Sequence, residues 1–336
     1  METRIYLATA QGVNVVSGSG ETWRGETRLK GKQVQSVAAA TSEPNRVYCG
    51  TFGEGVFRSD DGGATWRSCG LENEKVMSLA VAEDSVYAGT EPSAMFRSGN
   101  GGETWHRLPT FLNLPSAPEW SFPPRPETHH VRYILPDLHV HRRLHVAIEA
   151  GALLRSDDGG QTWRDRVPGG PRDTHTLAMH PSTLARLYSA AGDGYFESVD
   201  GGDAWRRIHD GLAHRYCWSL AVSLASPDTV LVTASRSARE AHGKNTANSF
   251  VYRRSDDEPW CEVRNGLPDS QKRRIAVVAA STVEPDVFYL SSEGEVYRSA
   301  DGGVGWQQLP VKWPQGSQPA HALNIAMMEA AVSSEK

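Results

Sequence analysis

One short motif recurs along the whole chain and limits what the chain can fold into. It has the pattern Ser-x-Asp-x-Gly-x-x-Trp, and two of its seven copies are degenerate. The copies are VVSGSGETW (15–23), SDDGGATW (59–66), SGNGGETW (98–105), SDDGGQTW (156–163), SVDGGDAW (198–205), RRSDDEPW (253–260) and SADGGVGW (299–306). Their tryptophans are 43, 39, 58, 42, 55 and 46 residues apart. The shorter spacings match one four-stranded propeller blade of roughly 40–45 residues.

Each repeat reads as short strands that lead into this motif, which we call the box. In the unit at residues 34–66, the runs VQSVAAA, RVYCGT and GVFRS are separated by turns. Short β-branched and aromatic runs bounded by Gly, Pro, Asn and Asp indicate strands. Asp61 is placed to accept backbone N–H groups of its own hairpin, and Trp66 to bury its ring. Seven copies around a ring cannot all form one active site, so the box predicts structure rather than catalysis.

The box resembles the Asp-box, or BNR repeat, of sialidases, sortilin-type receptors, some glycoside hydrolases and photosystem II assembly factors of the Ycf48 type. The resemblance covers nearly the whole chain. The resemblance implies an all-β propeller, and the seven copies make it a single seven-bladed β-propeller. It implies no particular activity, because these families share the hairpin and differ in function. Classical sialidase activity is not expected. The Phe/Tyr-Arg-Ile-Pro motif of sialidases is missing, VRYILP (131–136) matches it poorly, and classical sialidases have six blades.

The two ends of the chain are expected to close the ring together. The first box lies so early that its blade lacks an inner strand, and HALNIAMME (321–329) is expected to supply it. The three N-terminal strands of that blade are RIYLATA (4–10), GVNVVSG (12–18) and TWRGETR (22–28). Residues 1–330 then form one propeller domain and 331–336 a tail. No basic and apolar leader precedes RIYLATA, so the sequence predicts a cytoplasmic protein.

Composition argues against several classes of partner. Charged residues make up 22% of the chain and the formal net charge is -5, so no broad basic field is available for nucleic acid. No apolar run approaches the length of a membrane span, so no membrane partner is expected. The four cysteines show no CxxC spacing and are expected to be buried thiols. We expect a monomer or a dimer.

The two longest repeats predict where a functional site lies. The 58-residue spacing carries an insertion at about 109–128, and the 55-residue spacing carries RSAREAHGKNTANS (236–249). In a propeller both insertions fall on the face opposite the boxes. Long loops on a rigid scaffold commonly carry function.

Aligning the inner strands by their hydrophobic pattern predicts which side chains reach the central channel. The first tier is Gln33, Lys75, His130, Asp173, Tyr216, Arg274 and His321. The second tier, two residues further on and therefore on the same side of a regular strand, is Gln35, Met77, Arg132, His175, Trp218, Ala276 and Leu323. Glycine turns on the same face add Gln11, Glu54, Glu91, Glu149, Asp193, Arg236 and Glu293.

Histidine, arginine and acidic residues concentrate in blades 3 to 5 of this alignment, around PETHHVRY (126–133). Convergent polar groups in a concave site are typical of ligand binding. The predicted catalytic residues are His130, His175, Glu149, Asp193 and Tyr216. The predicted ligand-binding residues are Arg132, Arg274, Arg236, Trp218, Lys75 and Glu91. An imidazole titrates near neutral pH and suits an acid or base, and arginines suit an anionic group.

These residues leave several hypotheses open. The first is an enzyme of hydrolase or lyase type acting on a small polar or anionic ligand. The alternatives are a non-catalytic protein-interaction or assembly module on the same face, a His-ligated metalloenzyme, and a structural plug between blades. No cofactor is required, but His130, His175 and Glu149 are candidate ligands for a divalent metal, with His129 and His321 less secure. His139 and His141 are expected in a solvated turn on the box side.

Overall fold

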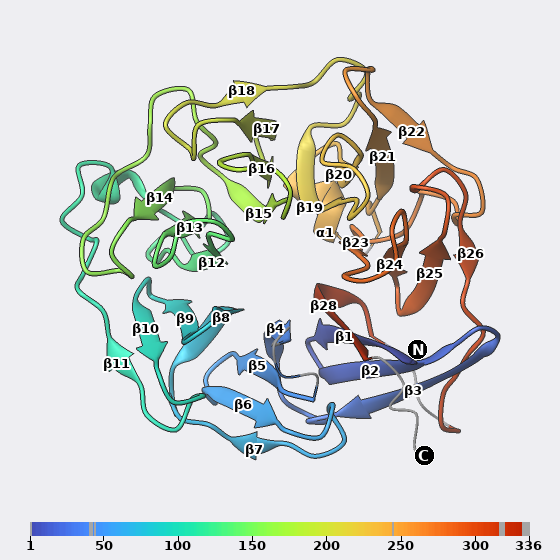
Figure 1. The fold of residues 1–336 in the computed structure, drawn as a ribbon, viewed down its shortest axis with the longest axis horizontal. Helices are drawn as coiled ribbons and strands as arrows, with labels where there is room; N and C mark the ends of the chain where they lie inside the picture. The colour runs from blue at the N-terminus through green and yellow to red at the C-terminus, as the bar shows by residue number, and fades with distance from the viewer. Residues whose placement is uncertain (1, 40–42, 44, 244, 316–319, 331–336) are drawn as a thin grey trace.

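The computed structural model describes residues 2–39, 43, 45–243, 245–315 and 320–330. Seven antiparallel sheets surround a central axis, and the chain visits them in sequence order (Figure 1). The protein is a seven-bladed β-propeller, as the repeat predicts. Within the described part of the chain, no helix combines the length and the apolar character that crossing a membrane requires.

The strands of each blade are given in order from the innermost, next to the central axis, to the outermost. Blades 1 and 2 contain β4 (Val34–Ala39), β5 (Val47–Thr51), β6 (Val56–Ser59), β7 (Arg67–Ser68), β8 (Lys75–Val81), β9 (Val86–Glu91), β10 (Met95–Ser98) and β11 (His106–Arg107). Blades 3 and 4 contain β12 (Val131–Pro136), β13 (Leu144–Ile148), β14 (Ala152–Ser156), β15 (Thr174–Met179), β16 (Leu187–Ala191), β17 (Gly194–Ser198) and β18 (Arg206–Arg207). Blades 5 and 6 contain β19 (Tyr216–Val222), β20 (Val230–Ser235), β21 (Phe250–Arg254), β22 (Cys261–Val263), β23 (Val277–Ala280), β24 (Phe288–Ser292), β25 (Glu295–Ser299) and β26 (Gln307–Gln308).

Blade 7 is built from both ends of the chain. It contains β28 (Ala322–Ala330), β1 (Glu2–Thr9), β2 (Gly12–Ser19) and β3 (Thr22–Arg28), and β28 pairs antiparallel with β1 along its length. This confirms the predicted closure by one C-terminal and three N-terminal strands. A further strand, β27 (Val311–Lys312), pairs in parallel with β3 at the outer edge of the blade. The sequence did not predict this outer strand.

Apolar clusters between neighbouring blades hold the ring together. Ile5, Trp23 and Tyr289 belong to a cluster that joins blade 7 to blade 6. Tyr188 and Trp260 belong to one that joins blade 4 to blade 5. Burying a large apolar side chain stabilises the fold by about 1.5–3 kcal/mol, so each blade depends on its neighbours for its core.

The box hairpins use their polar side chains internally. In the third well-kept copy, Asp158 accepts hydrogen bonds from the Thr162 amide at 2.9 Å and the Thr162 hydroxyl at 2.6 Å. These bonds lower the pKa of Asp158 to about 2. The Gly160 amide donates to Ser156 at 2.8 Å. The carboxylate therefore closes its own turn, which is the local task that the sequence predicts for the box.

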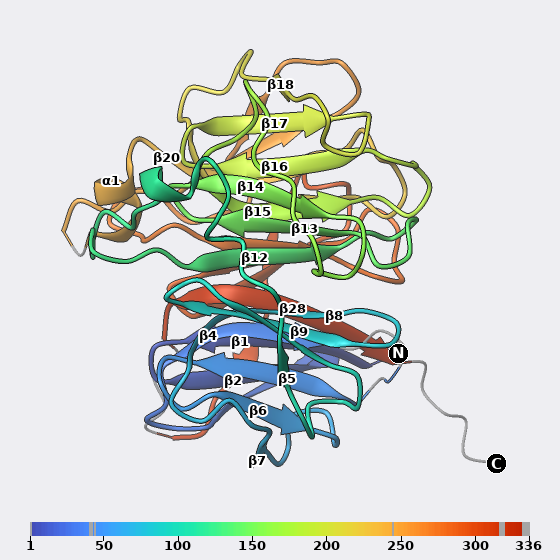
Figure 2. The same ribbon diagram turned by 90° about the vertical axis from the view of Figure 1, so that its left-hand side faces the viewer.

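Each of the two insertions contains one short helical segment. The first contains a 3-10 helix, η1 (Ala117–Glu119), and the second contains α1 (Ala238–His242), which is capped by the Ser237 side chain. Figure 2 shows α1 on one side of the disc and the arrowhead of β17, which leads into a box, on the other. The insertion at 236–249 is thus placed opposite the box hairpins.

Candidate functional site

The inner strands share an irregularity that decides how their side chains meet. In six blades, the register between the inner strand and its neighbour skips a position on the inner strand. The skipped residues are Gln35, Met77, Arg132, His175, Leu323 and the pair Trp218–Ser219. All except Ser219 are second-tier positions of the sequence alignment. A bulge bends the strand and re-aims the side chain, so these residues do not follow the alternation of a regular strand.

The first part of the site is a buried chain of charges that joins blades 2 and 3. Arg125, from the first insertion, donates to both carboxylate oxygens of Glu91 at 2.9 and 2.6 Å. His130 Nδ1 lies 3.5 Å from Glu91, and His130 Nε2 lies 2.9 Å from Glu149 Oε2. Lys75 Nζ lies 3.7 Å from Glu91 on its more exposed side. One imidazole thus bridges two carboxylates.

The groups of this bridge are buried, and their opposite charges set their pKa values. Glu91 is 2% exposed and His130 is 1% exposed. Burial alone raises the pKa of Glu91, but hydrogen bonds from His130 and Arg125 outweigh it and lower the pKa to about 2. Burial alone lowers the pKa of His130, but the charge and hydrogen bond of Glu149 outweigh it and raise the pKa. The opposite charges therefore hold one another ionised inside the protein.

Arg132 links this chain of charges to the aromatic wall of blade 5. Its Nε lies 3.4 Å from Glu149 Oε2, and its guanidinium lies 4.3 Å from the ring centre of Trp218. Burial alone raises the pKa of Glu149, but the charges of His130 and Arg132 lower it well below its usual range. The Arg132 side chain is 10% exposed, so Glu149 and Trp218 neutralise and shield a cation that the sequence assigned to an anionic ligand.

The second part of the site surrounds His175, whose side chain is 0% exposed. Its Nδ1 lies 2.7 Å from the carbonyl oxygen of Cys217 in the neighbouring blade, so Nδ1 carries a proton and donates it. Its Nε2 points toward three groups: Asp173 Oδ1 at 3.6 Å, the Tyr216 hydroxyl at 3.5 Å and Glu149 Oε1 at 4.0 Å. The backbone of blade 5 therefore fixes the orientation of an imidazole that faces two carboxylates.

The second insertion completes the site with a residue that the sequence analysis did not select. His242, the last residue of α1, is exposed, and its Nε2 lies 3.2 Å from the Tyr216 hydroxyl. Its ring packs edge-on against Trp218 at 4.5 Å between centres. Desolvation of the packed imidazole and then the charge of His175 lower the pKa of His242 to about 4. Burial and then the carboxylates of Glu149 and Asp173 raise the pKa of Tyr216. Both groups are therefore uncharged near neutral pH.

The remaining predicted residues have separate partners. Arg274 donates from Nε and Nη2 to both oxygens of Glu293 at 3.1 and 2.6 Å. Arg236 is exposed, 3.8 Å from Glu240. Arg207 Nη2 donates to Asp193 at 3.2 Å, and burial raises the pKa of that carboxyl. These contacts neutralise Arg274 and occupy Asp193 within their own blades.

Four further histidines, His129, His321, His139 and His141, each have separate surroundings. The His129 ring packs edge-on against Trp120 at 5.7 Å between centres. Burial and then the charge of Arg274 lower the pKa of His321 to about 4. His139 Nε2 lies 3.2 Å from the carbonyl oxygen of His180, and His141 is exposed.

Sequence reasoning missed two members of the site for the same reason. Arg125 and His242 lie in the insertions, which have no counterpart in the other repeats and so cannot be aligned with them. Asp173 stood in the first tier but was not singled out. A single arginine or histidine in a polar loop carries no periodic signal, and its position depends on how the loop packs.

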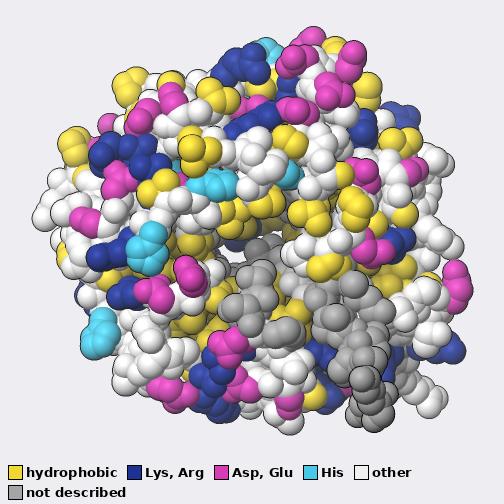
Figure 3. All heavy atoms as spheres, in the orientation of Figure 1, with side chains coloured by type: hydrophobic (Ala, Val, Ile, Leu, Met, Phe, Trp, Pro, Cys, Tyr) yellow, Lys and Arg dark blue, Asp and Glu magenta, His cyan; other side chains and the backbone are white. Residues whose placement is uncertain are grey.

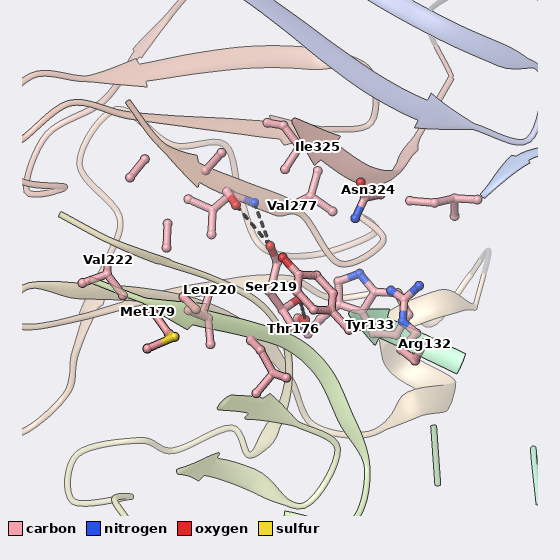
Figure 4. A pocket seen from close by; sticks show the side chains of 18 residues that line it. Arg132, Tyr133, Thr176, Met179, Ser219, Leu220, Val222, Val277, Asn324 and Ile325 are labelled. Carbon is pink, nitrogen blue, oxygen red and sulfur yellow. Dashed lines mark hydrogen bonds between the residues drawn. The ribbon is translucent and has the colours of Figure 1, made fainter. Parts of the chain in front are cut away.

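Below Arg132 and Trp218 the channel continues as a cavity of about 230 Å³. Figure 4 shows its wall, in which Leu220, Val277 and Ile325 contribute apolar side chains. Two of its hydroxyl groups are occupied: Ser219 bonds the backbone of Val278, and Thr176 donates to the carbonyl oxygen of Trp218. Figure 3 shows one face of the ring, with acidic and basic side chains interspersed around a hollow centre. Arg132, Tyr133 and Asn324 also line this cavity, so its wall mixes polar and apolar side chains.

No protein-family model matches the chain, and no curated protein matches its sequence. Solved structures do match its fold. The GH74 enzyme of Niastella koreensis has a TM-score of 0.68 and 15% identity, over 90% of this chain and 52% of that one. An ancestral GH74 enzyme has a TM-score of 0.64 and 18% identity, over 83% of this chain and 38% of that one. The chain thus spans about half or less of these enzymes.

A structure described as YCF48 bound to D1 peptide has a TM-score of 0.58 and 18% identity, over 82% of this chain and 80% of that one. This chain shares the seven-bladed propeller fold. At these identities the likeness extends to the fold alone. The same architecture occurs in GH74 enzymes and in a peptide-bound protein, so the fold is compatible with either kind of function.

Proposed function

We propose that this propeller binds a small polar ligand on its insertion-bearing face and turns it over by acid–base chemistry of hydrolase or lyase type. The observation that carries the proposal is the orientation of His175. Its Nδ1 is committed to the Cys217 carbonyl, and its Nε2 is directed at Asp173, Glu149 and the Tyr216 hydroxyl. A ring nitrogen with a fixed partner on one side and titratable groups on the other is the arrangement of a general acid or base.

The groups that a ligand would meet first are those in front of His175. The Asp173 side chain is 28% exposed, Tyr216 is half-buried and His242 is exposed. Asp173 accepts a hydrogen bond from the Ala150 amide at 2.7 Å, which holds its carboxylate in place. These groups offer hydrogen bonds and aromatic surface for a polar ligand.

Because the arginines of the site are paired with carboxylates, they favour an uncharged polar ligand over a strongly anionic one. Arg132 is paired with Glu149, Arg274 with Glu293 and Arg125 with Glu91. An anion would have to compete with these carboxylates, two of which are largely buried. Breaking a buried ion pair is costly, so the proposed ligand contacts Asp173 and the aromatic groups instead.

The proposal is tested with a panel of chromogenic esters, lactones, glycosides and phosphate esters. Substrates turned over by the wild-type protein should lose most of their turnover with His175→Gln, because general acid–base catalysis typically contributes about 10²–10⁴-fold. His141→Ala, on the exposed turn before β13, is the matched control and should retain full activity. The proposal fails if no member of the panel is bound or converted, or if folded His175→Gln is fully active.

A second candidate is a non-catalytic module that docks a protein segment on the same face. It is favoured by the peptide-bound YCF48 structure, which this chain matches over most of both lengths, and by the internal pairing of the buried charges. His175→Gln distinguishes the two candidates. A docking module would keep its affinity for its partner, because the buried imidazole does not touch the docked surface. An enzyme would lose turnover.

A further inference from the structure

Three side chains of the site converge closely enough to share one ion. One ligand atom each from Glu149, Asp173 and His175 lies within 4.8 Å of the other two. The individual separations from His175 Nε2 are 3.6 Å to Asp173 Oδ1 and 4.0 Å to Glu149 Oε1. Ligand atoms bound at about 2.0–2.2 Å to one tetrahedral ion lie about 3.3–3.6 Å apart, so the triad would contract slightly around a metal ion.

Each of these side chains is already held in position by a second contact. The Cys217 carbonyl orients His175, and the Ala150 amide orients Asp173. His130 and Arg132 both approach Oε2 of Glu149, which leaves Oε1 directed at His175. Metal-binding histidines characteristically donate their other N–H group to a carbonyl or carboxylate, and bound carboxylates are hydrogen-bonded in turn.

The ligand atoms of this triad face one another. His175 is fully buried, and in the tautomer fixed by Cys217 its unprotonated Nε2 would face two carboxylates across 3.6 and 4.0 Å. A metal ion between these atoms would accept a lone pair from each of them. We propose that Glu149, Asp173 and His175 together bind one divalent transition-metal ion. One imidazole and two carboxylates are a donor set that zinc accepts, with a position left open for water or substrate.

The inference rests on the site of the proposed function and changes the role of His175: an Nε2 that binds a metal ion cannot also exchange a proton, and water activated by the metal would supply the acid–base step. Metal binding can be measured without any turnover. The experiment uses the full chain, stripped with a chelator and titrated with zinc chloride by calorimetry. Stoichiometric binding of one zinc ion per chain is expected. Asp173→Asn keeps the size of the side chain but removes its charge, and it should weaken zinc binding at least tenfold. Cobalt(II) in place of zinc should produce visible absorption that the same substitution abolishes.

Two control variants show whether a loss of zinc binding is specific to the triad. Asp269→Asn removes an exposed carboxylate from the loop before β23 and should leave the zinc affinity unchanged. His139→Ala with His141→Ala removes two histidines of the turn before β13 and should also have no effect. Circular dichroism melts of Asp173→Asn establish that the variant is folded.

The inference is overturned if zinc produces no saturable one-to-one binding, or if Asp173→Asn and His175→Gln bind it as the wild type does. In the first case the three side chains form only a cluster of polar contacts. If zinc binding fails while turnover still depends on His175, only the metal site is lost and the proposed function stands. If zinc binds but no panel substrate is bound or converted, the metal site stands and the proposed function falls.

Discussion

His175 Nδ1 lies 2.7 Å from the Cys217 carbonyl oxygen, and this contact joins the inner strands of blades 4 and 5. It requires a bulge in each strand, because both His175 and Trp218 are skipped in the register of their sheets. The bulges free backbone groups and side chains that a regular ladder would occupy. The site is therefore a property of neighbouring blades and not of one repeat.

His130 should make stability depend on pH in a defined direction. Its pKa is raised in the folded state, so its contribution is fully present below about pH 6.5 and is lost as the pH rises through the folded value. The pKa of Glu91 is lowered to about 2, so its contribution is present above the unfolded value and is lost as the pH falls toward 2. Melting temperature against pH should peak between these limits.

The variant His130→Gln isolates the histidine from the carboxylates. We expect it to lower the unfolding free energy by about 1–3 kcal/mol near pH 5–6, because buried carboxylates lose a charged donor. The deficit should shrink as the pH rises through the folded pKa of His130, where the wild type loses its own proton. A deficit that is independent of pH would mean that the ring acts through packing alone.

Arg125→Lys tests the docking of the first insertion. Lysine cannot form the two parallel bonds that Arg125 makes to the buried Glu91. We expect a loss of about 1–3 kcal/mol in unfolding free energy and faster proteolysis within residues 109–128. Arg24→Lys, on an exposed arginine of β3, is the control and should melt as the wild type does. Equal proteolysis of Arg125→Lys and wild type would contradict the anchoring role.

Gly25→Ala tests the outer strand of blade 7. A Cβ atom at Gly25 would lie 2.7 Å from ring atoms of Trp313, which follows β27. The substitution should cost about 1–3 kcal/mol in unfolding free energy through overpacking, or displace β27 from β3. Gly99→Ala, where nothing lies within 4 Å of the new atom, is the matched control. Identical melting of both variants would mean that Trp313 moves aside without cost.

Removing residues 321–336 tests the closure. The deletion takes away β28 and leaves the inner edge of β1 without a partner. An unpaired edge strand invites association, so the truncated chain should aggregate or melt far below the full chain. Lys312→Ala, exposed on β27, should behave as wild type. A monomeric truncated chain with an unchanged melting temperature would show that the ring does not need β28.

His242→Ala tests whether the second insertion contributes to function. The residue ends α1 and is exposed, although its ring contacts Trp218 and Tyr216, so the melting temperature should fall only slightly. Turnover of any substrate found with the chromogenic panel should fall about tenfold, which corresponds to roughly 1.4 kcal/mol of lost interaction. The expected effect is on kcat/KM, and His141→Ala serves as the control. Unchanged kinetics would place the ligand away from α1.

Some of the residues of the site were predicted correctly from the sequence, and others were not. Glu149, His175 and Tyr216 were found by aligning repeats, and they do lie together. The alignment also grouped Arg274 and Asp193 with them, but Glu293 and Arg207 pair with these residues instead. Ion pairs of this kind join positions that no repeat relates to one another. The predicted cytoplasmic location and the expectation of a monomer or dimer stay predictions.

The sequence by itself determined the propeller, its seven blades and the closing strand, because strand alternation, turn residues and the box tryptophans are local signals repeated at a regular spacing. Tertiary structure decided the site. The bulges at Arg132 and His175 interrupt the alternation from which facing side chains are inferred, and Arg125 and His242 arrive from loops without a periodic pattern. Which carboxylate each cation meets depends on burial and on contacts between blades, and these exist only once the ring has closed.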